Sequence, residues 1–143
     1  MTPRSFRDLA IGDELGPARD QVDQARVRRF LSVRGSGRHD GRFTSLEEAK
    51  ALGLPRLLVP GPLLAGLLDR TLRQWLPTAR LTKLDLVFRR NVWQDSPFEM
   101  QAIVVDILED EGEPAVTLDL TVVDESGDHC VTGTATLVFP REA

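Results

Sequence analysis

The most apolar stretch of the chain has a helical period. Between Pro62 and Leu76, apolar residues occupy most of the circumference of the first two helical turns, and a polar strip is confined to the C-terminal half. Pro62 suits the first turn of a helix, where its missing N–H has no intrahelical acceptor, and Pro77 marks the end. A helix that is apolar on nearly all sides has to be buried nearly all round. The pattern therefore predicts a buried central helix from Pro62 to Leu76.

From Leu81 onward the hydrophobic pattern takes the period of a strand. Apolar and polar residues alternate, which is typical of strands with one buried and one exposed face. Short polar stretches at 110–113 and 124–128 predict turns, and therefore an antiparallel meander. The expected strands are Leu81–Phe88, Phe98–Glu109, Ala115–Asp124 and His129–Phe139. The sequence thus predicts an α+β fold in which an antiparallel sheet wraps around the apolar helix.

Two shorter helices and a loop are predicted before the central helix. The stretch Val22 to Val33 is amphipathic, and Asp23 can cap its start. A second helix is expected from Leu46 to Leu52, behind a capping box that begins at Ser45. Residues 35–42 between them are rich in glycine and contain no apolar side chain, which predicts a loop. Loops of this kind often carry functional residues.

Composition and charge narrow the class of protein. A chain of 143 residues with 41% hydrophobic and 28% charged residues is expected to form one globular domain over residues 1–143. The net charge of -4 argues against a nucleic-acid partner, which needs a basic face. The single cysteine excludes an internal disulfide, and the sequence lacks a leader pattern and an apolar run long enough to cross a membrane. We therefore expect a cytoplasmic protein without a membrane partner.

Two kinds of residue bear on ligands. With two histidines and one cysteine the usual zinc ligand sets are not available, so no metal is expected. An arginine-rich run interrupts the acidic balance, and it either forms a solvated helix face or attracts a phosphorylated acyl carrier. That carrier would be the diphosphate of coenzyme A or the phosphopantetheine of a carrier protein. The run consists of Arg26, Arg28, Arg29, Arg34, Arg38 and Arg42.

Several sequence strings, in this order, carry a resemblance to a known family. Phe6–Asp13 looks like the family's opening strand, and Ala49–Pro55 looks like its short helix and exit turn. Gly61 begins the central helix as the family's glycine does, Phe88–Ser96 resembles its central strand and turn, and Gly133–Thr136 resembles its last strand. Over nearly its whole length the chain thus resembles the MaoC-like branch of the hot-dog fold. This branch includes the (R)-specific enoyl-CoA hydratases and the acyl-carrier dehydratases.

The resemblance implies a single hot-dog domain that forms a dimer with its sheets joined edge to edge. An acyl thioester would enter a tunnel between the subunits, carried by coenzyme A or phosphopantetheine and with no further cofactor. A backbone amide at the start of the central helix, here that of Gly61, would meet the thioester oxygen. Hydration of an enoyl thioester needs a base for water, a proton source for the alpha carbon, and donors for the enolate oxygen.

The loop that carries the family's acid and base departs from the family pattern. The hydratase loop reads Asp-x-Asn-Pro-x-His, and here Arg38 stands at the Asp position and Phe43 at the His position. Arginine stays protonated at neutral pH, and phenylalanine has no proton to exchange. His39 and Asp40 offer the same chemical groups nearby and are the candidate catalytic pair. In the other interpretation Asp40 binds loop amides and His39 is solvated. The candidate substrate-binding residues are Gly61, Arg38 and Phe43.

Three functions remain open. The first is a MaoC-like hydratase- or dehydratase-type enzyme that acts on an enoyl-CoA or acyl-carrier substrate through a non-standard loop. The second is a non-catalytic hot-dog subunit, or an acyl-binding module, that pairs with a catalytic partner. The third is an isomerase or cyclase on a polyketide-like substrate. The chain is accordingly expected to form a homodimer or a heterodimer with another hot-dog chain.

Overall fold

The helices and strands follow the predicted order, with additions at the N-terminal end. The computed structural model describes residues 2–34, 41–109 and 112–141. The elements are a 3-10 helix η1 (Phe6–Asp8), β1 (Glu14–Asp20), α1 (Gln24–Arg34), α2 (Gly41–Thr44), α3 (Leu46–Ala51), α4 (Gly61–Trp75), β2 (Arg80–Phe88), β3 (Phe98–Leu108), β4 (Ala115–Asp124) and β5 (His129–Val138).

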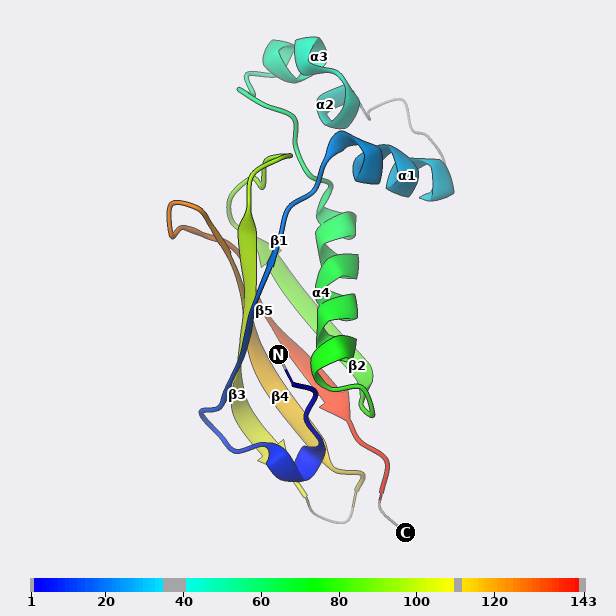
Figure 1. The fold of residues 1–143 in the computed structure, drawn as a ribbon, viewed down its shortest axis with the longest axis vertical. Coiled ribbons are helices and arrows are strands. Elements are labelled where there is room, and N and C mark those ends of the chain that lie inside the picture. The colour runs from blue at the N-terminus through cyan, green and yellow to red at the C-terminus, as the bar shows by residue number, and fades with distance from the viewer. Residues whose placement is uncertain (1, 35–40, 110–111, 142–143) are drawn as a thin grey trace.

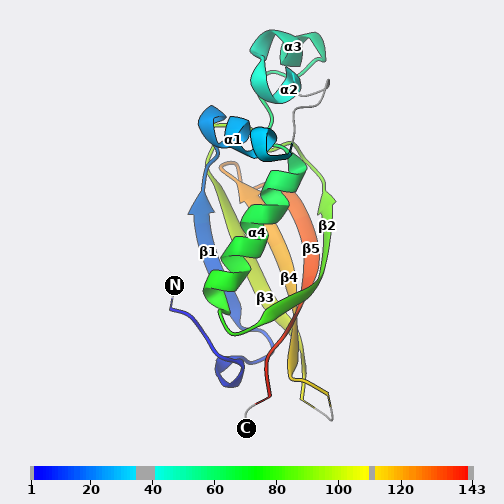
Figure 2. The same cartoon turned by 90° about the vertical axis from the view of Figure 1, so that its right-hand side faces the viewer.

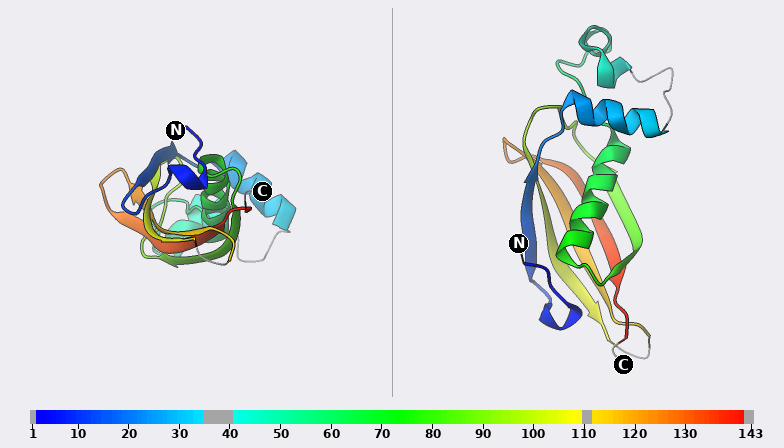
Figure 3. Two further views of the ribbon diagram at one scale, coloured as in Figure 1. Left: turned by 90° about the horizontal axis from the view of Figure 1, so that it is seen from below. Right: turned by 45° about the vertical axis from the view of Figure 1, so that its right-hand side comes forward.

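The strands form one antiparallel sheet that curves around α4. Its five strands are ordered β1-β3-β4-β5-β2, so that β1 and β2 are the edges. The helix α4 runs along the inner face of the sheet (Figure 1), and in a view from the helix side the strands spread out behind it (Figure 2). Seen from below, the sheet bends around the helix (Figure 3). The predicted α+β fold, a sheet wrapped around an apolar helix, is confirmed.

The sheet buries the face that the sequence pattern predicts, but the prediction that α4 is buried nearly all round is wrong. Pro62 and Gly66, in the first half of α4, are exposed, because the sheet covers the helix from one side. Leu68 and Leu72 of α4 are at most 2% exposed. The alternating positions of β4 are likewise buried, while their neighbours face outward. Such alternation allows one sheet face to pack on the helix while the other stays in solvent. The inward residues of β4 are Val116, Leu118, Leu120 and Val122.

The prediction is wrong about where the first strand lies. The string Phe6–Asp13, which resembled an opening strand, contains the short helix η1 and a turn, and β1 begins only at Glu14. The strand contains Gly16 and Pro17, and its pairing with β3 shifts register there. Both residue types are depleted in strands, which explains why the periodicity did not reveal β1.

Element boundaries and strand order differ in smaller ways. The meander β3-β4-β5 is confirmed, but β2 pairs with β5 at the far edge. The central helix begins at Gly61 and ends at Trp75, with Pro60 as its N-cap. Within the predicted loop 35–42, Gly41 and Arg42 belong to α2, and the rest lies outside the described residues.

The first half of the chain places three helices beyond the N-terminal end of α4. Figure 1 shows α1, α2 and α3 gathered there, away from the main sheet. Asp23 caps α1 as predicted, because Arg26 N–H donates to Asp23 Oδ1 at 2.9 Å. Ser45 Oγ likewise accepts from Glu48 N–H at the start of α3. Among the described residues no helix is long and apolar enough to cross a membrane.

Candidate functional site

The start of α4 presents a backbone donor that the fold leaves unused. Leu63 N–H and Leu64 N–H donate to the Pro60 carbonyl at 3.1 and 3.2 Å, and Pro62 has no N–H. Within the described part of the chain, no acceptor receives the Gly61 N–H. Helix N-termini carry a partial positive charge because their first amides lack intrahelical partners. The Gly61 amide can therefore bind a carbonyl oxygen and stabilise negative charge that develops on it.

The ring of Phe88 lies beside this helix start. A Cβ atom built on Gly61 would lie 3.3 Å from Phe88 Cζ and 3.4 Å from its Cε1. Phe88 ends the edge strand β2 and is 50% exposed. Its register partner is Val131, which is buried in the core, and residues directly opposite each other in a sheet point to the same face. The Phe88 ring therefore belongs to the inner face of the sheet, next to Gly61.

Phe43, one of the predicted substrate-binding residues, is a core residue. It lies on α2 and is 6% exposed, in the same apolar cluster as Leu64 and Leu67 of α4. The guanidinium carbon of Arg42 lies 4.4 Å from the centroid of its ring. Phe43 therefore brings no titratable group to the start of α4.

Two glutamines hold the backbone of Phe43 in place. Gln94 is buried, and its Nε2 donates to the carbonyls of Phe43 and Leu58, both at 2.7 Å. Gln24 Nε2 donates to the same Phe43 carbonyl at 2.9 Å and to Gln94 Oε1 at 2.6 Å. The Oε1 atom of Gln24 is buried without a hydrogen-bond partner. We call Gln24 and Gln94 the glutamine clamp. It joins α1 and α2 to Leu58, which precedes α4, and to the turn after β2, in which Gln94 lies.

The candidate catalytic pair cannot be placed. His39 and Asp40, together with the candidate substrate-binding residue Arg38, lie outside the described residues. In the described part of the arginine run, Arg26 pairs with Asp20 at 2.9 Å, whereas Arg28 is exposed on α1. Of the predicted site residues, Gly61 and Phe43 are therefore described, the first at the helix start and the second in the core cluster.

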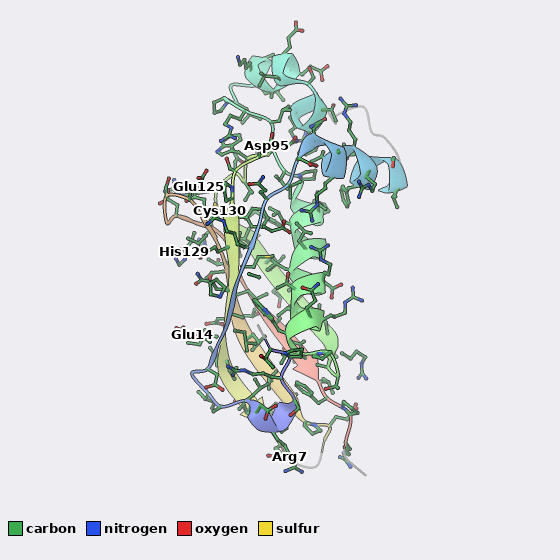
Figure 4. The ribbon with its side chains drawn as sticks, viewed as in Figure 1. Arg7, Glu14, Asp95, Glu125, His129 and Cys130 are labelled. Carbon is green, nitrogen blue, oxygen red and sulfur yellow. The ribbon has the colours of Figure 1, made fainter. Side chains whose placement is uncertain are left out.

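Other polar groups gather away from the helix start. A cavity of about 340 Å³ lies on the outer face of the sheet, and its lining includes Glu14, Asp119 and His129. His129 is exposed, as predicted, and lies on the side of the sheet opposite α4 (Figure 4). Among the described residues, no cluster of three or more His, Cys, Asp or Glu side chains is placed to hold a metal ion.

Cys130 is buried on β5, as predicted from its place in a strand. Burial, followed by the charge of Asp124, raises the pKa of the thiol to about 11, and Cys130 Sγ lies 3.6 Å from Asp124 Oδ2. The thiolate is the form that reacts with alkylating agents.

We therefore expect Cys130 to resist iodoacetamide at pH 8 in the folded protein and to react in urea, as measured by mass spectrometry. Above the ordinary thiol pKa the unfolded chain loses this proton while the folded chain keeps it until about pH 11. This group therefore lowers the free energy of unfolding as the pH rises through that window. Rapid alkylation without denaturant would contradict the burial of the thiol.

Sequence reasoning missed the roles of Phe88 and of the glutamine clamp. The inward alternation Leu84, Leu86, Phe88 along β2 was the available signal for Phe88, because it places the ring on the helix side. The clamp had no such signal. Gln24 and Gln94 are 70 positions apart in the chain and meet only through the fold.

The fold has close counterparts among solved structures. The (R)-hydratase from A. caviae involved in PHA biosynthesis matches with a TM-score of 0.83 and 24% identity, over 94% of this chain and 99% of that chain. The MaoC-like dehydratase from Rhodospirillum rubrum matches with 0.79 and 21% identity, over 96% and 97% of the two chains. A chain of the C-terminally truncated HadBC (3R-hydroxyacyl-ACP dehydratase) complex from Mycobacterium tuberculosis matches with 0.70 and 18% identity, over 89% and 95%.

Sequence comparison adds nothing to these likenesses, because no family model and no curated protein matches the chain significantly. The similarity in structure nevertheless extends over 94% of this chain. The chain therefore has the hot-dog fold of the (R)-hydratases and MaoC-like dehydratases.

Proposed function

We propose that the chain is a MaoC-like protein of the hydratase and dehydratase type that binds an acyl thioester at the start of α4. The observation that carries the proposal is the unused Gly61 N–H at the positive end of a 15-residue helix. A thioester carbonyl bound there would place its carbonyl carbon beside the Phe88 ring. The amide would also stabilise the enolate oxygen that forms when a proton leaves the alpha carbon in dehydration or when water adds to the beta carbon in hydration.

The proton transfers require groups other than Phe43. Addition of water to an enoyl thioester needs one group to remove a proton from water and one to protonate the alpha carbon. We assign these roles to Asp40 and His39, in line with the resemblance. The carrier of the acyl group is proposed to be coenzyme A or a phosphopantetheine arm, with Arg38 as a candidate contact.

A second candidate function is a subunit that binds the acyl group while another hot-dog chain supplies the acid and base. The burial of Phe43 in the core at the family's His position favours it. The HadBC structure is a complex of hot-dog chains, which supports this kind of assembly as a precedent. Turnover of crotonyl-CoA by the purified chain alone, measured by loss of enoyl absorbance, would rule against this second function. Turnover that arises only with a second hot-dog chain would favour it.

The proposed role of Gly61 is tested by two variants that place the same Cβ beside Phe88. Gly61→Pro removes the N–H, and Gly61→Ala keeps it. The helix tolerates proline here because the preceding Pro60 already has an extended ψ of 136° and the amide has no intrahelical acceptor. We expect Gly61→Pro to bind butanoyl-CoA about tenfold more weakly than Gly61→Ala, as measured by calorimetry, because one hydrogen bond is lost.

Both variants add the same Cβ next to Phe88, so the difference between them reports the replacement of the N–H by the proline ring. Circular dichroism should show equal helix content for both, because position 61 is in the first helical turn. Equal affinity of the two folded variants for the thioester would overturn the proposed role of the Gly61 amide.

A further inference from the structure

Phe88 is an inner-face residue that the chain itself does not cover. Its neighbours on the same face of β2, Leu84 and Leu86, are half-buried and pack against the core, whereas Phe88 is 50% exposed. The difference arises from position, because Phe88 ends β2 at the level where α4 begins. The half-exposed ring of Phe88 and the unused Gly61 N–H therefore form one surface, with an apolar part and a polar part.

The backbone around Phe88 is fixed, although its ring is not enclosed. Beyond the end of β2, Arg89 N–H donates to the Cys130 carbonyl at 2.8 Å, and the Arg89 side chain donates through Nε to Thr132 Oγ1 at 2.8 Å. The backbone is thus bound to β5 both at Phe88 and at the residue that follows it. The ring therefore occupies a defined place next to Gly61 and can change it only by side-chain rotation.

We infer that Phe88 determines acyl specificity by limiting the room beside the thioester carbonyl. This inference rests on the proposed binding of the thioester oxygen to Gly61 N–H. With the oxygen at that amide, carbon 2 of the acyl group lies one bond from the carbonyl carbon. The Phe88 ring is close by, because a Cβ added to Gly61 would lie 3.3 Å from Phe88 Cζ. A straight chain can pass the flat ring, whereas a methyl branch on carbon 2 meets it.

The test compares two saturated probes that cannot be hydrated, butanoyl-CoA and 2-methylbutanoyl-CoA. We expect the wild-type chain to bind the straight probe about tenfold more tightly, the range found when a pocket discriminates by a single carbon. Phe88→Ala should bring the ratio of the two dissociation constants close to one, and Phe88→Leu should give an intermediate ratio. The quantity measured is that ratio, by calorimetry, so a uniform change in affinity cancels.

The matched control is Val87→Ala. Val87 precedes Phe88 in the same strand and is exposed to the same degree, 52%, but its partner Thr132 places it on the outer face. Its substitution should leave the ratio within about twofold of wild type, since it does not face α4. A ratio in Phe88→Ala equal to that of Val87→Ala, with both probes still bound, would overturn the role of Phe88 and leave the proposed function standing. Failure of the wild-type chain to bind either probe would overturn both.

Discussion

Replacement of Gly133 by alanine should detach the edge strand β2 from β5 and lower the free energy of unfolding by about 3 kcal/mol. Gly133 is paired with Leu86 of β2, and a Cβ at this position would lie 2.1 Å from the Asp85 carbonyl oxygen and 2.9 Å from Leu86 Cδ2. The first of these contacts is with backbone, so a side-chain rotation cannot relieve it. The whole edge strand has to move, at the expense of its ladder of hydrogen bonds.

Urea denaturation followed by circular dichroism would measure this effect, with Gly66→Ala as the matched control. Gly66 lies inside α4, where an added Cβ meets nothing within 4 Å. Alanine is favoured over glycine in a helix, so the control should be neutral or up to about 1 kcal/mol more stable than wild type. A Gly133→Ala protein as stable as Gly66→Ala would show that β2 does not pack on β5 as described.

Replacement of Gln94 by leucine should lower the free energy of unfolding by about 3 kcal/mol. Leucine has a similar size but no polar atoms, so it fills the same space without making the hydrogen bonds of Gln94. The change leaves the Leu58 carbonyl without its donor and removes the acceptor of Gln24 Nε2. Gln94 is 4% exposed, so water cannot simply replace these partners. Each buried polar group left without a partner costs about 1 to 3 kcal/mol.

The control for Gln94→Leu is Gln101→Leu. Gln101 lies on the outer face of the sheet and makes a single long hydrogen bond to Glu99, at 3.4 Å. This substitution should change stability by less than about 0.5 kcal/mol. A double variant, Gln24→Leu with Gln94→Leu, should be less destabilised than the sum of the single variants, because the two side chains share the Phe43 carbonyl. Additive losses in thermal or urea unfolding would contradict the clamp.

The clamp also bears on the candidate site. The residues proposed to move protons, His39 and Asp40, come shortly before Phe43 in the sequence. Since Gln24 and Gln94 both bind the Phe43 carbonyl, they fix the chain at the C-terminal end of that segment. Loss of turnover in Gln94→Leu would therefore report on positioning as well as on stability.

The fold was predictable where hydrophobic periodicity is strong. The central helix and the strands β2 to β5 end within a residue or two of their predicted limits, because each has an apolar face that must be buried. The strand β1 was not predictable. It has one fully buried apolar residue, Leu15, and it is placed by its hydrogen bonds with β3 rather than by its own pattern.

For the candidate site, the sequence by itself determined the position of the backbone donor and the residue type at position 43. The glycine between two prolines, at the start of an apolar helix, predicts that the Gly61 amide lies in the first helical turn. The residue type alone shows that Phe43 has no titratable group. The tertiary structure decided what surrounds them. Strand pairing brings Phe88 to within contact distance of Gly61, and packing brings Gln24 to Gln94. Both are contacts between segments far apart in the chain, which local periodicity does not encode and only the folded arrangement creates.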